Sequence, residues 1–173
     1  MLLYIYMMIN FLQSFARTDE YINNLLYTSR NVSIIKIFIW ITLLGEIYTI
    51  ILFTLITSII FWLANKKWQI IGLLLAVIGS AGTTFLAKII FARPRPLNAV
   101  FLETSASFPS GHATIAIAFY GFITYLLFKE IRKKRDRVLV AFFGSILILA
   151  IGFSRLYLGV HYVSDVLIGY LIG

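Results

Sequence analysis

The stretch Ser154–Asp165 reads SRLYLGVHYVSD and joins two apolar runs near the end of the chain. His161 and Asp165 stand four residues apart, so on a helix they share one face and lie within side-chain reach. A carboxylate beside an imidazole fixes its tautomer and stabilises the imidazolium, which leaves the other ring nitrogen ready to act as a nucleophile or base. Arg155 adds a planar fork that suits phosphate or carboxylate. The stretch therefore indicates a reactive site or, as the simpler interpretation, a helix-end ion pair with an interfacial arginine.

The composition of the whole chain indicates a membrane protein. Hydrophobic residues make up 61% of the 173 residues and charged residues 13%, and several apolar runs approach the ~20 residues that a spanning helix needs. Nothing resembles a linker, a repeat or a low-complexity tract, so we expect a single domain over residues 1–173. Without cysteine there is neither a disulfide framework nor thiolate chemistry. The basic residues behind the net charge of +8 cluster in short loops between apolar runs, which favours membrane lipids over nucleic acid as the partner.

The apolar runs predict an all-α, polytopic membrane helix bundle with about six membrane helices. The expected membrane helices cover residues 1–15, 37–63, 69–90, 111–128 and 138–153, and a last run from about residue 160. The first is short, and the amphipathic pattern of residues 17–36 predicts a segment lying at the membrane interface. The last run stops at Gly173 after roughly 14 residues, or about 20 Å, which is less than the ~30 Å hydrocarbon core, so we expect this helix to be truncated.

The basic loops predict the orientation of the bundle. The loops at Lys66–Lys67 and Lys129–Arg137 fall on one side of the expected bundle. Basic loops are retained in the cytoplasm, so the segments Arg93–His112 and Ser154–His161 are expected on the non-cytoplasmic face of the cell membrane. The polar clusters of the chain therefore converge at that face.

Two of these clusters add cations and an anion site to the first stretch. Lys88, near the end of its apolar run, can reach toward the interface and Arg95, although a snorkelling lysine beside an ordinary basic turn is the simpler interpretation. Ser110 is a good helix N-cap, and the free amides of a helix start bind anions, which would place His112 beside the bound anion. An ordinary capped helix start is the simpler interpretation here.

Together the clusters suit phosphoryl transfer. The transition state of that reaction needs positioning and fixed positive charge, together with an attacking group and a proton donor for the leaving oxygen. His112 and His161 are the only histidines of the chain. Carboxylates are sparse and the cations would repel Mg²⁺ or Zn²⁺, so we expect no metal site and no other cofactor.

In order and spacing, these residues resemble the motifs of the type 2 phosphatidic acid phosphatase family. The motifs are Lys88, six residues and Arg95-Pro96; Pro109-Ser110-Gly111-His112; and Ser154-Arg155, five residues, His161, three residues and Asp165. All three motifs are complete, and the resemblance covers roughly residue 37 to the end of the chain. The resemblance implies a metal-independent enzyme, usually with six membrane helices.

The resemblance also implies a role for each motif residue. His161 matches the nucleophile that forms a phosphohistidine, Asp165 matches the residue that orients it, and His112 matches the general acid. The positions that bind the phosphate are matched by Lys88, Arg95, Ser110, Gly111 and Arg155.

We therefore expect an integral membrane lipid phosphatase whose substrate is a lipid phosphate. The small size and short loops resemble bacterial members, which act on undecaprenyl diphosphate, our first expectation, or on phosphatidylglycerophosphate and phosphatidate with broad specificity, the alternative. A transporter for phosphate-bearing molecules could also use cations at helix ends, but it does not require His112 or the pair of His161 and Asp165. Soluble haloperoxidases carry similar motifs, but this chain is too apolar for one.

Glu46 lies inside the second expected membrane helix and has no matching role in the family motifs. An ionisable group there costs ~2.5–3.5 kcal/mol on insertion scales, which makes it a candidate for a functional site. The alternative is a protonated Glu46 that is hydrogen-bonded to a neighbouring helix.

Overall fold

The computed structural model describes the backbone of residues 2–173 and the side chains of residues 6 and 15–173. It is helical throughout, and the described residues contain no strand, which confirms the expected all-α class. The elements are α1 (Leu2–Thr28), α2 (Val32–Leu43), α3 (Ile47–Leu63), α4 (Lys67–Phe91), α5 (Gly111–Ala116), η1 (Ile117–Gly121), α6 (Phe122–Glu130), α7 (Lys134–Tyr157) and α8 (Val163–Ile172). The single π-helical turn η1 joins α5 and α6 into one continuous helix over residues 111–130.

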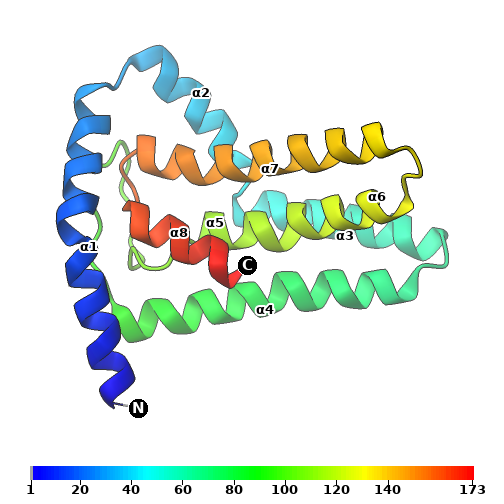
Figure 1. Ribbon diagram of the computed structural model, residues 1–173, viewed down its shortest axis with the longest axis horizontal. Helices are drawn as coiled ribbons and strands as arrows, with labels where there is room; N and C mark the ends of the chain where they lie inside the picture. The colour runs from blue at the N-terminus through cyan, green and yellow to red at the C-terminus, as the bar shows by residue number, and fades with distance from the viewer. Residues whose placement is uncertain (1) are drawn as a thin grey trace.

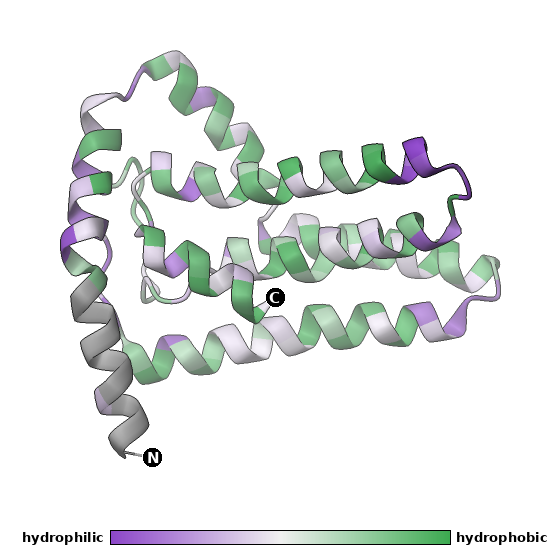
Figure 2. Ribbon diagram, viewed as in Figure 1, coloured by the Kyte–Doolittle hydropathy of each residue, from purple (hydrophilic) through white to green (hydrophobic). Residues whose placement is uncertain are grey.

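The long helices lie side by side and form a membrane-type bundle (Figure 1). Three helices are long and apolar enough to cross a membrane, namely α4, the continuous helix over residues 111–130, and α7. The bent pair of α2 and α3 would be a fourth span, and α8 is a shorter apolar helix. Hydrophobic residues occur along most of the length of these helices, and the most hydrophilic residues lie mainly near their ends and in the loops (Figure 2). This distribution matches a hydrocarbon environment, where helices satisfy their own backbone groups.

The second expected membrane helix is wrong as a single run, because it breaks between α2 and α3. The two helices meet at an angle of 43° around Leu44, Gly45 and Glu46. A Cβ at Gly45 would lie 2.8 Å from Ile151 Cγ2, so only glycine allows this approach to α7. The Tyr120 hydroxyl donates to the Leu44 carbonyl at 2.7 Å and satisfies a backbone group near the break.

The N-terminal region also differs from the expectation. Instead of a short membrane helix followed by an interfacial segment over residues 17–36, one helix, α1, continues to Thr28, and α2 begins at Val32. Asn31 caps α2 by accepting a hydrogen bond from Ser33 N at 2.8 Å. α1 runs across the end of the bundle rather than along it (Figure 1), and it packs against α7 and α8. The side chains of residues 1–5 and 7–14, on which the expected first membrane helix depends, lie outside the described residues.

The later helices follow the expected runs more closely. The run over residues 69–90 corresponds to α4, the run over 111–128 to the continuous helix that ends at Glu130, and the run from about 160 to α8. α7 is longer than expected, because it begins at Lys134 and ends at Tyr157. Arg155 therefore belongs to the last turn of α7, where a cation interacts favourably with the helix dipole.

Two clusters of buried apolar side chains hold the bundle together. Ile50 of α3, Leu73 of α4 and Phe119 of η1 are buried in the first cluster, while Ile148 and Ile151 of α7 are buried in the second. Complete burial of such a side chain stabilises a fold by about 1.5–3 kcal/mol in water. In a bilayer that gain is replaced by close packing between helices.

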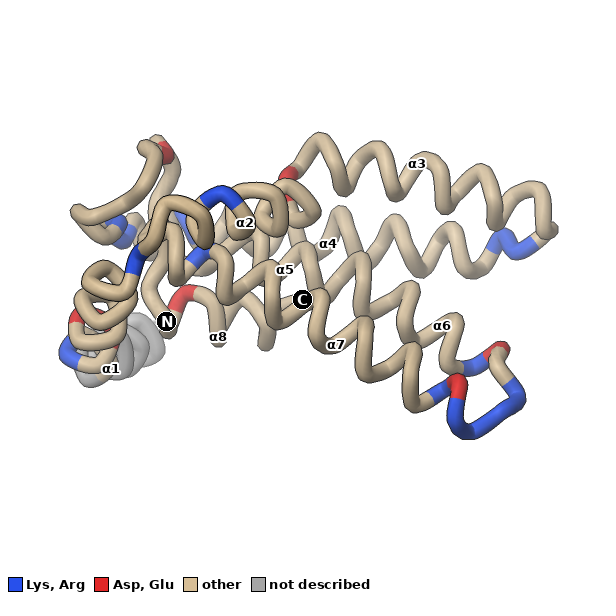
Figure 3. The backbone as a smooth tube through the Cα atoms, turned by 90° about the horizontal axis from the view of Figure 1, so that it is seen from above, with Lys and Arg blue, Asp and Glu red and all other residues tan. Residues whose placement is uncertain are grey.

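Charged residues lie mainly in the loops at the two ends of the bundle (Figure 3). The turn between α3 and α4 and the loop between α6 and α7 carry the basic residues at one end, and Lys66 forms an ion pair with Glu130 there. The loop between α4 and α5 and the loop between α7 and α8 lie at the other end (Figure 1). The grouping of the loops expected from the sequence is thus present in the fold.

This separation predicts the outcome of a labelling experiment. The chain has no cysteine, so Leu97→Cys, at a fully exposed position, and Lys133→Cys introduce single labels at opposite ends. Because basic loops stay in the cytoplasm, an impermeant thiol reagent should label Leu97→Cys in intact cells and label Lys133→Cys only after lysis. Labelling of Lys133→Cys alone in intact cells would reverse the proposed orientation.

Candidate active site

The loop between α7 and α8 places His161 at one end of the bundle. Gly159 has a φ of +67°, in the left-handed region that favours glycine, and this allows the tight turn after α7. Val160 N donates to the Arg155 carbonyl at 3.1 Å and closes the turn. The His161 side chain is only 2% exposed. Its position is therefore fixed by the backbone and by the surrounding side chains.

Asp165 lies on the first turn of α8, where its carboxylate acts as part of a helix cap. Asp165 Oδ2 accepts a hydrogen bond from Tyr162 N at 2.8 Å, and the Ser107 hydroxyl donates to the same oxygen. His161 Nδ1 lies 3.4 Å from Asp165 Oδ2. The pair is therefore present, but the expectation that both residues share one helical face is wrong, because His161 precedes the helix. A cap at the start of α8 brings them together instead.

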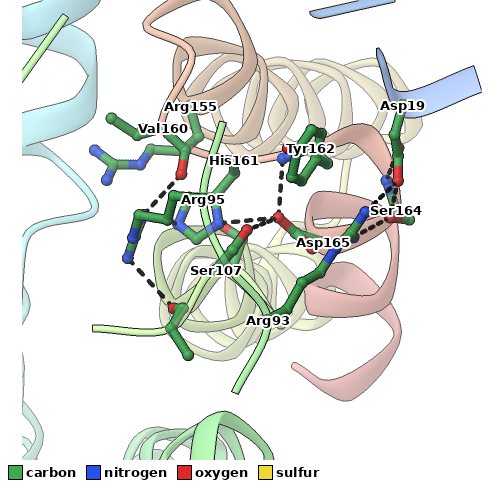
Figure 4. Close-up of polar contacts among 12 residues, drawn as sticks. Asp19, Arg93, Arg95, Ser107, Arg155, Val160, His161, Tyr162, Ser164 and Asp165 are labelled. Atoms are coloured by element: carbon green, nitrogen blue, oxygen red, sulfur yellow. Dashed lines mark hydrogen bonds and ion pairs between the residues drawn. The ribbon is translucent and has the colours of Figure 1, made fainter. Parts of the chain in front are cut away.

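The contacts of His161 identify its tautomer (Figure 4). Arg95 Nη1 lies 3.2 Å from His161 Nε2. A guanidinium only donates hydrogen bonds, so Nε2 is the acceptor and the ring proton resides on Nδ1, facing Asp165. Burial, helped by Arg155 and Arg95, lowers the pKa of His161 to about 4, although Asp165 acts in the opposite direction. The ring is thus neutral at pH 7, and its Nε2 lone pair accepts the hydrogen bond from Arg95.

Two arginines place positive charge close to His161. Arg95 donates to the Val160 carbonyl at 2.7 Å and to the Ser105 carbonyl at 2.8 Å, and Arg155 Nη1 donates to Thr42 Oγ1 at 2.7 Å. These contacts hold both guanidinium groups against the site. Arg155 Nε is buried and has no hydrogen-bond partner among the described residues, which leaves one donor for a ligand.

Glu103 bridges the two arginines. Its Oε2 lies 2.6 Å from Arg95 Nη2, and its Oε1 forms an ion pair with Arg155. Burial raises the pKa of Glu103, but Arg155 and Arg95 outweigh it, so the net pKa lies below the ordinary value. The carboxylate is therefore ionised and lies between the two guanidinium groups.

The residues of the second motif complete the site from the start of α5. Ser110 N donates to the Asp165 carbonyl at 3.0 Å, which attaches α5 to α8. Ser110 is the N-cap residue of α5, as expected, but its side chain makes no capping bond, and its buried hydroxyl has no partner among the described residues. A buried hydroxyl without a partner costs about 1–3 kcal/mol, so this group is available to a ligand. Lys88, from α4, donates to the carbonyl of Ala106, which lies in the loop between α4 and α5.

His112 and Glu46 form a second histidine–carboxylate pair. His112 Nε2 lies 3.3 Å from Glu46 Oε2, and the Glu46 side chain is 41% exposed at the break between α2 and α3. The break explains why a carboxylate is tolerated in an otherwise apolar run. Glu46 is placed to orient His112, which favours the functional interpretation of this residue.

The site shows no grouping of metal ligands. In the part of the chain that the structure describes, no three His, Asp or Glu side chains gather as a metal ion would require. The carboxylates of the site instead pair with cations, as Glu103 does with Arg95 and Arg155.

An apolar cavity adjoins His112 and Lys88. It has a volume of about 240 Å³, and Ile47, Phe85 and Ile115 are among the apolar residues that line it. α4 contributes most of one wall, and the α2–α3 break and the start of α5 contribute the rest. The polar site is therefore continuous with a space suited to an apolar group.

The structure brings together every residue that the sequence predicts for the site, and it adds four that the sequence analysis missed. Three of these are Asp19, Ser107 and Glu103, which lie outside the motifs, and the fourth is Arg93, which the sequence analysis named only as the start of the segment Arg93–His112. Their contacts span up to 145 residues of sequence, so no local pattern shows them. The available signal was the scarcity of acidic residues, since the chain has only 7.

Comparisons with known proteins agree with this geometry. A family profile described as the PAP2 superfamily matches residues 69–173. Phosphatidylglycerophosphatase B from Bacillus subtilis (strain 168) is 40% identical over 72 residues, which are 41% of this chain and 36% of that protein. The matched stretch thus spans about a third of the length of this curated relative.

Two solved structures are also similar. The crystal structure of the first transmembrane PAP2 type phosphatidylglycerolphosphate phosphatase, from Bacillus subtilis, is similar over 94% of this chain and 83% of that chain, with a TM-score of 0.83 and 29% identity. The crystal structure of Aquifex aeolicus LpxE is similar over 90% of this chain and 89% of that chain, with a TM-score of 0.69 and 26% identity.

The bridge made by Glu103 predicts how the site binds anions. An anion must displace this carboxylate, so Glu103→Gln should bind orthovanadate about tenfold more tightly, which corresponds to about 1.4 kcal/mol. Isothermal titration calorimetry of the purified protein in detergent measures the change, and Glu130→Gln, at the opposite end of the bundle, is the matched control. Equal or weaker binding by Glu103→Gln would contradict the assignment of the arginine pair as the anion site.

Proposed function

The chain belongs to the PAP2 superfamily, and from this membership and the site geometry we propose that it is an integral membrane lipid phosphatase that forms a phosphohistidine at His161. The observation that carries the proposal is the His161 ring, whose Nδ1 faces Asp165 and whose Nε2 faces Arg95, with the charge of Arg155 nearby. A neutral imidazole held between a carboxylate and two cations is an activated nucleophile aimed at an anion.

The first chemical step transfers the phosphoryl group to His161. Nε2 attacks phosphorus, the bond from phosphorus to the lipid oxygen breaks, and His112 donates a proton to that oxygen. The imidazole becomes positively charged, and Asp165 stabilises this charge through Nδ1–H. Glu46, 3.3 Å from His112, holds the acid in place.

The second step returns the enzyme to its resting state. His112, now neutral, removes a proton from water, and the water oxygen attacks phosphorus as the bond to Nε2 breaks. Inorganic phosphate leaves, and His161 is neutral again. Both steps use the same two histidines, so the chain needs no further proton donor.

The phosphate is bound by the cations that face His161. Arg95 and Arg155 exchange Glu103 for the phosphate oxygens, and Lys88 with the Ser110 hydroxyl and the Gly111 amide complete the clamp. Negative charge on the transferring group is greatest in the transition state, where each fixed donor contributes most. Losing one such donor typically costs about 2.7–4 kcal/mol, or a factor of ~10²–10³ in rate.

We propose a lipid phosphate monoester or diphosphate as the substrate, with the lipid arriving from the bilayer. The apolar cavity beside His112 and Lys88 is suited to the part of the lipid next to the phosphate. Undecaprenyl diphosphate remains a candidate, but the relatives that carry phosphatidylglycerophosphate in their names make that lipid the first to test. The active site would then face the non-cytoplasmic side, opposite the basic loops. A transporter would not require a nucleophile and a separate acid.

The two histidines should respond differently to the leaving group. His161→Ala should abolish phosphate release from phosphatidylglycerophosphate, undecaprenyl diphosphate, phosphatidate and p-nitrophenyl phosphate alike. His112→Ala should lose far more activity on phosphatidate, whose alkoxide leaves badly, than on the nitrophenyl ester, whose leaving group needs little acid. Phosphate release by the purified variants in detergent measures both effects, and EDTA should leave the rates unchanged. Identical losses for both variants on every substrate would contradict the two roles.

The low pKa of His161 predicts activity in acid. The ring is nucleophilic only when neutral, and its pKa near 4 rather than 6.5 keeps it neutral down to about pH 4. For p-nitrophenyl phosphate, kcat/KM corrected for the titration of the ester should therefore fall with an apparent pKa well below 6.5. Asp165→Asn removes a negative charge that favours protonation, so it should move this pKa further down. An apparent pKa at or above 6.5 would show that burial does not control the nucleophile.

A further inference from the structure

A buried carboxylate reaches the site from α1. Asp19 is 1% exposed, although its neighbour Glu20 on the same helix is exposed. Asp19 Oδ1 accepts a hydrogen bond from Ser164 N at 3.0 Å, at the first turn of α8. α1 crosses the end of the bundle at this point (Figure 1). A buried charge is costly without partners, so the contacts of Asp19 explain how it is tolerated.

Arg93 connects Asp19 to Asp165 (Figure 4). Its Nη2 lies 2.8 Å from Asp19 Oδ2 and its Nη1 lies 2.7 Å from Asp165 Oδ1. The guanidinium also stacks on the Tyr162 ring, with the central carbon 4.3 Å from the ring centroid. Burial lowers the pKa of Arg93, but Asp165 and Asp19 outweigh it and raise the net pKa. Arg93 is thus a permanent cation between two carboxylates, and no step of the proposed reaction uses it.

The charges of Asp19, Arg93 and Asp165 together determine how strongly an imidazolium at His161 is stabilised. Asp165 is shared between His161 and Arg93, and a cation on one carboxylate oxygen weakens the support that the other oxygen gives to an imidazolium. Asp19 offsets the charge of Arg93. Asp19, Arg93 and Asp165 together therefore present one net negative charge to the ring, whereas Arg93 and Asp165 alone would present none.

We propose that Asp19 and Arg93 are positioning residues of this site, which set the charge and the place of Asp165 and thereby the basicity of His161. The inference rests on the proposed function, because it concerns the nucleophile of that reaction. It gives α1 a part in catalysis, although α1 contributes no group that touches the substrate.

A merely structural role for Asp19 makes a different prediction. If Asp19 only attached α1 to α8, its loss would loosen the site and admit water, and the pKa of His161 would rise toward its ordinary value of 6.5. In the electrostatic role, removing the negative charge lowers the pKa of His161. Removing the positive charge of Arg93 raises it. The two roles therefore differ in the sign of the change for Asp19→Asn.

The test is the titration of the His161 ring nitrogens by NMR in protein labelled with ¹⁵N-histidine. The chain has two histidines, so His112→Gln assigns the signals. The charged groups near His161 are Asp165 from α8, Arg95 and Glu103 from the loop between α4 and α5, and Arg155 from α7, and none of them is changed. Relative to wild type, the ring should titrate at lower pH in Asp19→Asn and at higher pH in Arg93→Gln. Glu20→Gln, which changes an exposed carboxylate next to Asp19, should titrate as wild type does.

Arg93→Gln leaves two buried carboxylates without their cation, and this variant can fail to fold. The double variant Asp19→Asn/Arg93→Gln removes one of those carboxylates as well and therefore provides a second test. Removing both charges should return the titration to the wild-type pH or above it, because the two lost charges are opposite and Asp165 alone again presents one net negative charge to the ring. A double variant that titrates no higher than Asp19→Asn would overturn the proposal. An upward shift or no shift in Asp19→Asn would do the same.

Steady-state kinetics gives a second readout. Asp19→Asn should lower kcat for the nitrophenyl ester about tenfold, the factor that corresponds to about one pKa unit, with little change in KM. The double variant should recover most of that loss, and a kcat in Asp19→Asn equal to that of Glu20→Gln would contradict the proposal. Turnover by wild type tests the proposed function, whereas the ring titration needs no turnover, so the two ideas can fail separately.

Discussion

The carboxylate of Asp165 at the first turn of α8 is the contact on which the rest of the site depends. It caps its own helix through Tyr162 N, accepts a hydrogen bond from Ser107, and faces both His161 and Arg93. Those partners come from the loop before α8 and from the loop between α4 and α5. A fully buried carboxylate requires several such partners to remain ionised. Its position therefore determines where each of these segments can lie.

The second constraint is the concentration of positive charge at one end of an apolar bundle. Lys88, Arg95 and Arg155 converge on a small volume, and Glu103 pairs with two of them. In the proposed reaction the phosphate takes the place of this carboxylate, so one anion replaces another between the arginines. Fixed cations also need little reorganisation when charge develops, which is the main source of electrostatic catalysis.

Much of the fold follows from hydropathy, because a bilayer tolerates only segments that satisfy their own backbone groups. The apolar runs that became α4, α7 and α8 were predicted for this reason. The break at Gly45 and the course of α1 were not, because each depends on contacts with distant helices: Gly45 approaches α7 closely, and α1 packs on α7 and α8. Hydropathy indicates whether a segment lies in the membrane, but it does not indicate which helices the segment packs against.

The site shows the same division between local and distant information. The motif spacing identified His161, Asp165 and the anion-binding residues, although it suggested a shared helical face where the structure has a helix cap. Asp19 and Glu103 were missed, because each is a single acidic residue whose partners lie far away in the sequence. In an apolar chain with few carboxylates, a buried carboxylate indicates a cation or a hydrogen-bond donor beside it, since burial without a partner is costly.

The central claim is that His161 carries the phosphoryl group, and the most direct measurement is mass spectrometry of a trapped intermediate. His112→Ala, which slows the second step, is mixed with p-nitrophenyl phosphate, quenched in base, where phosphohistidine survives, and digested. One phosphate on the peptide that contains His161, lost on brief acid treatment and missing from a variant that also carries His161→Ala, is the predicted result. Phosphate on any other residue, or its persistence without His161, would contradict the account.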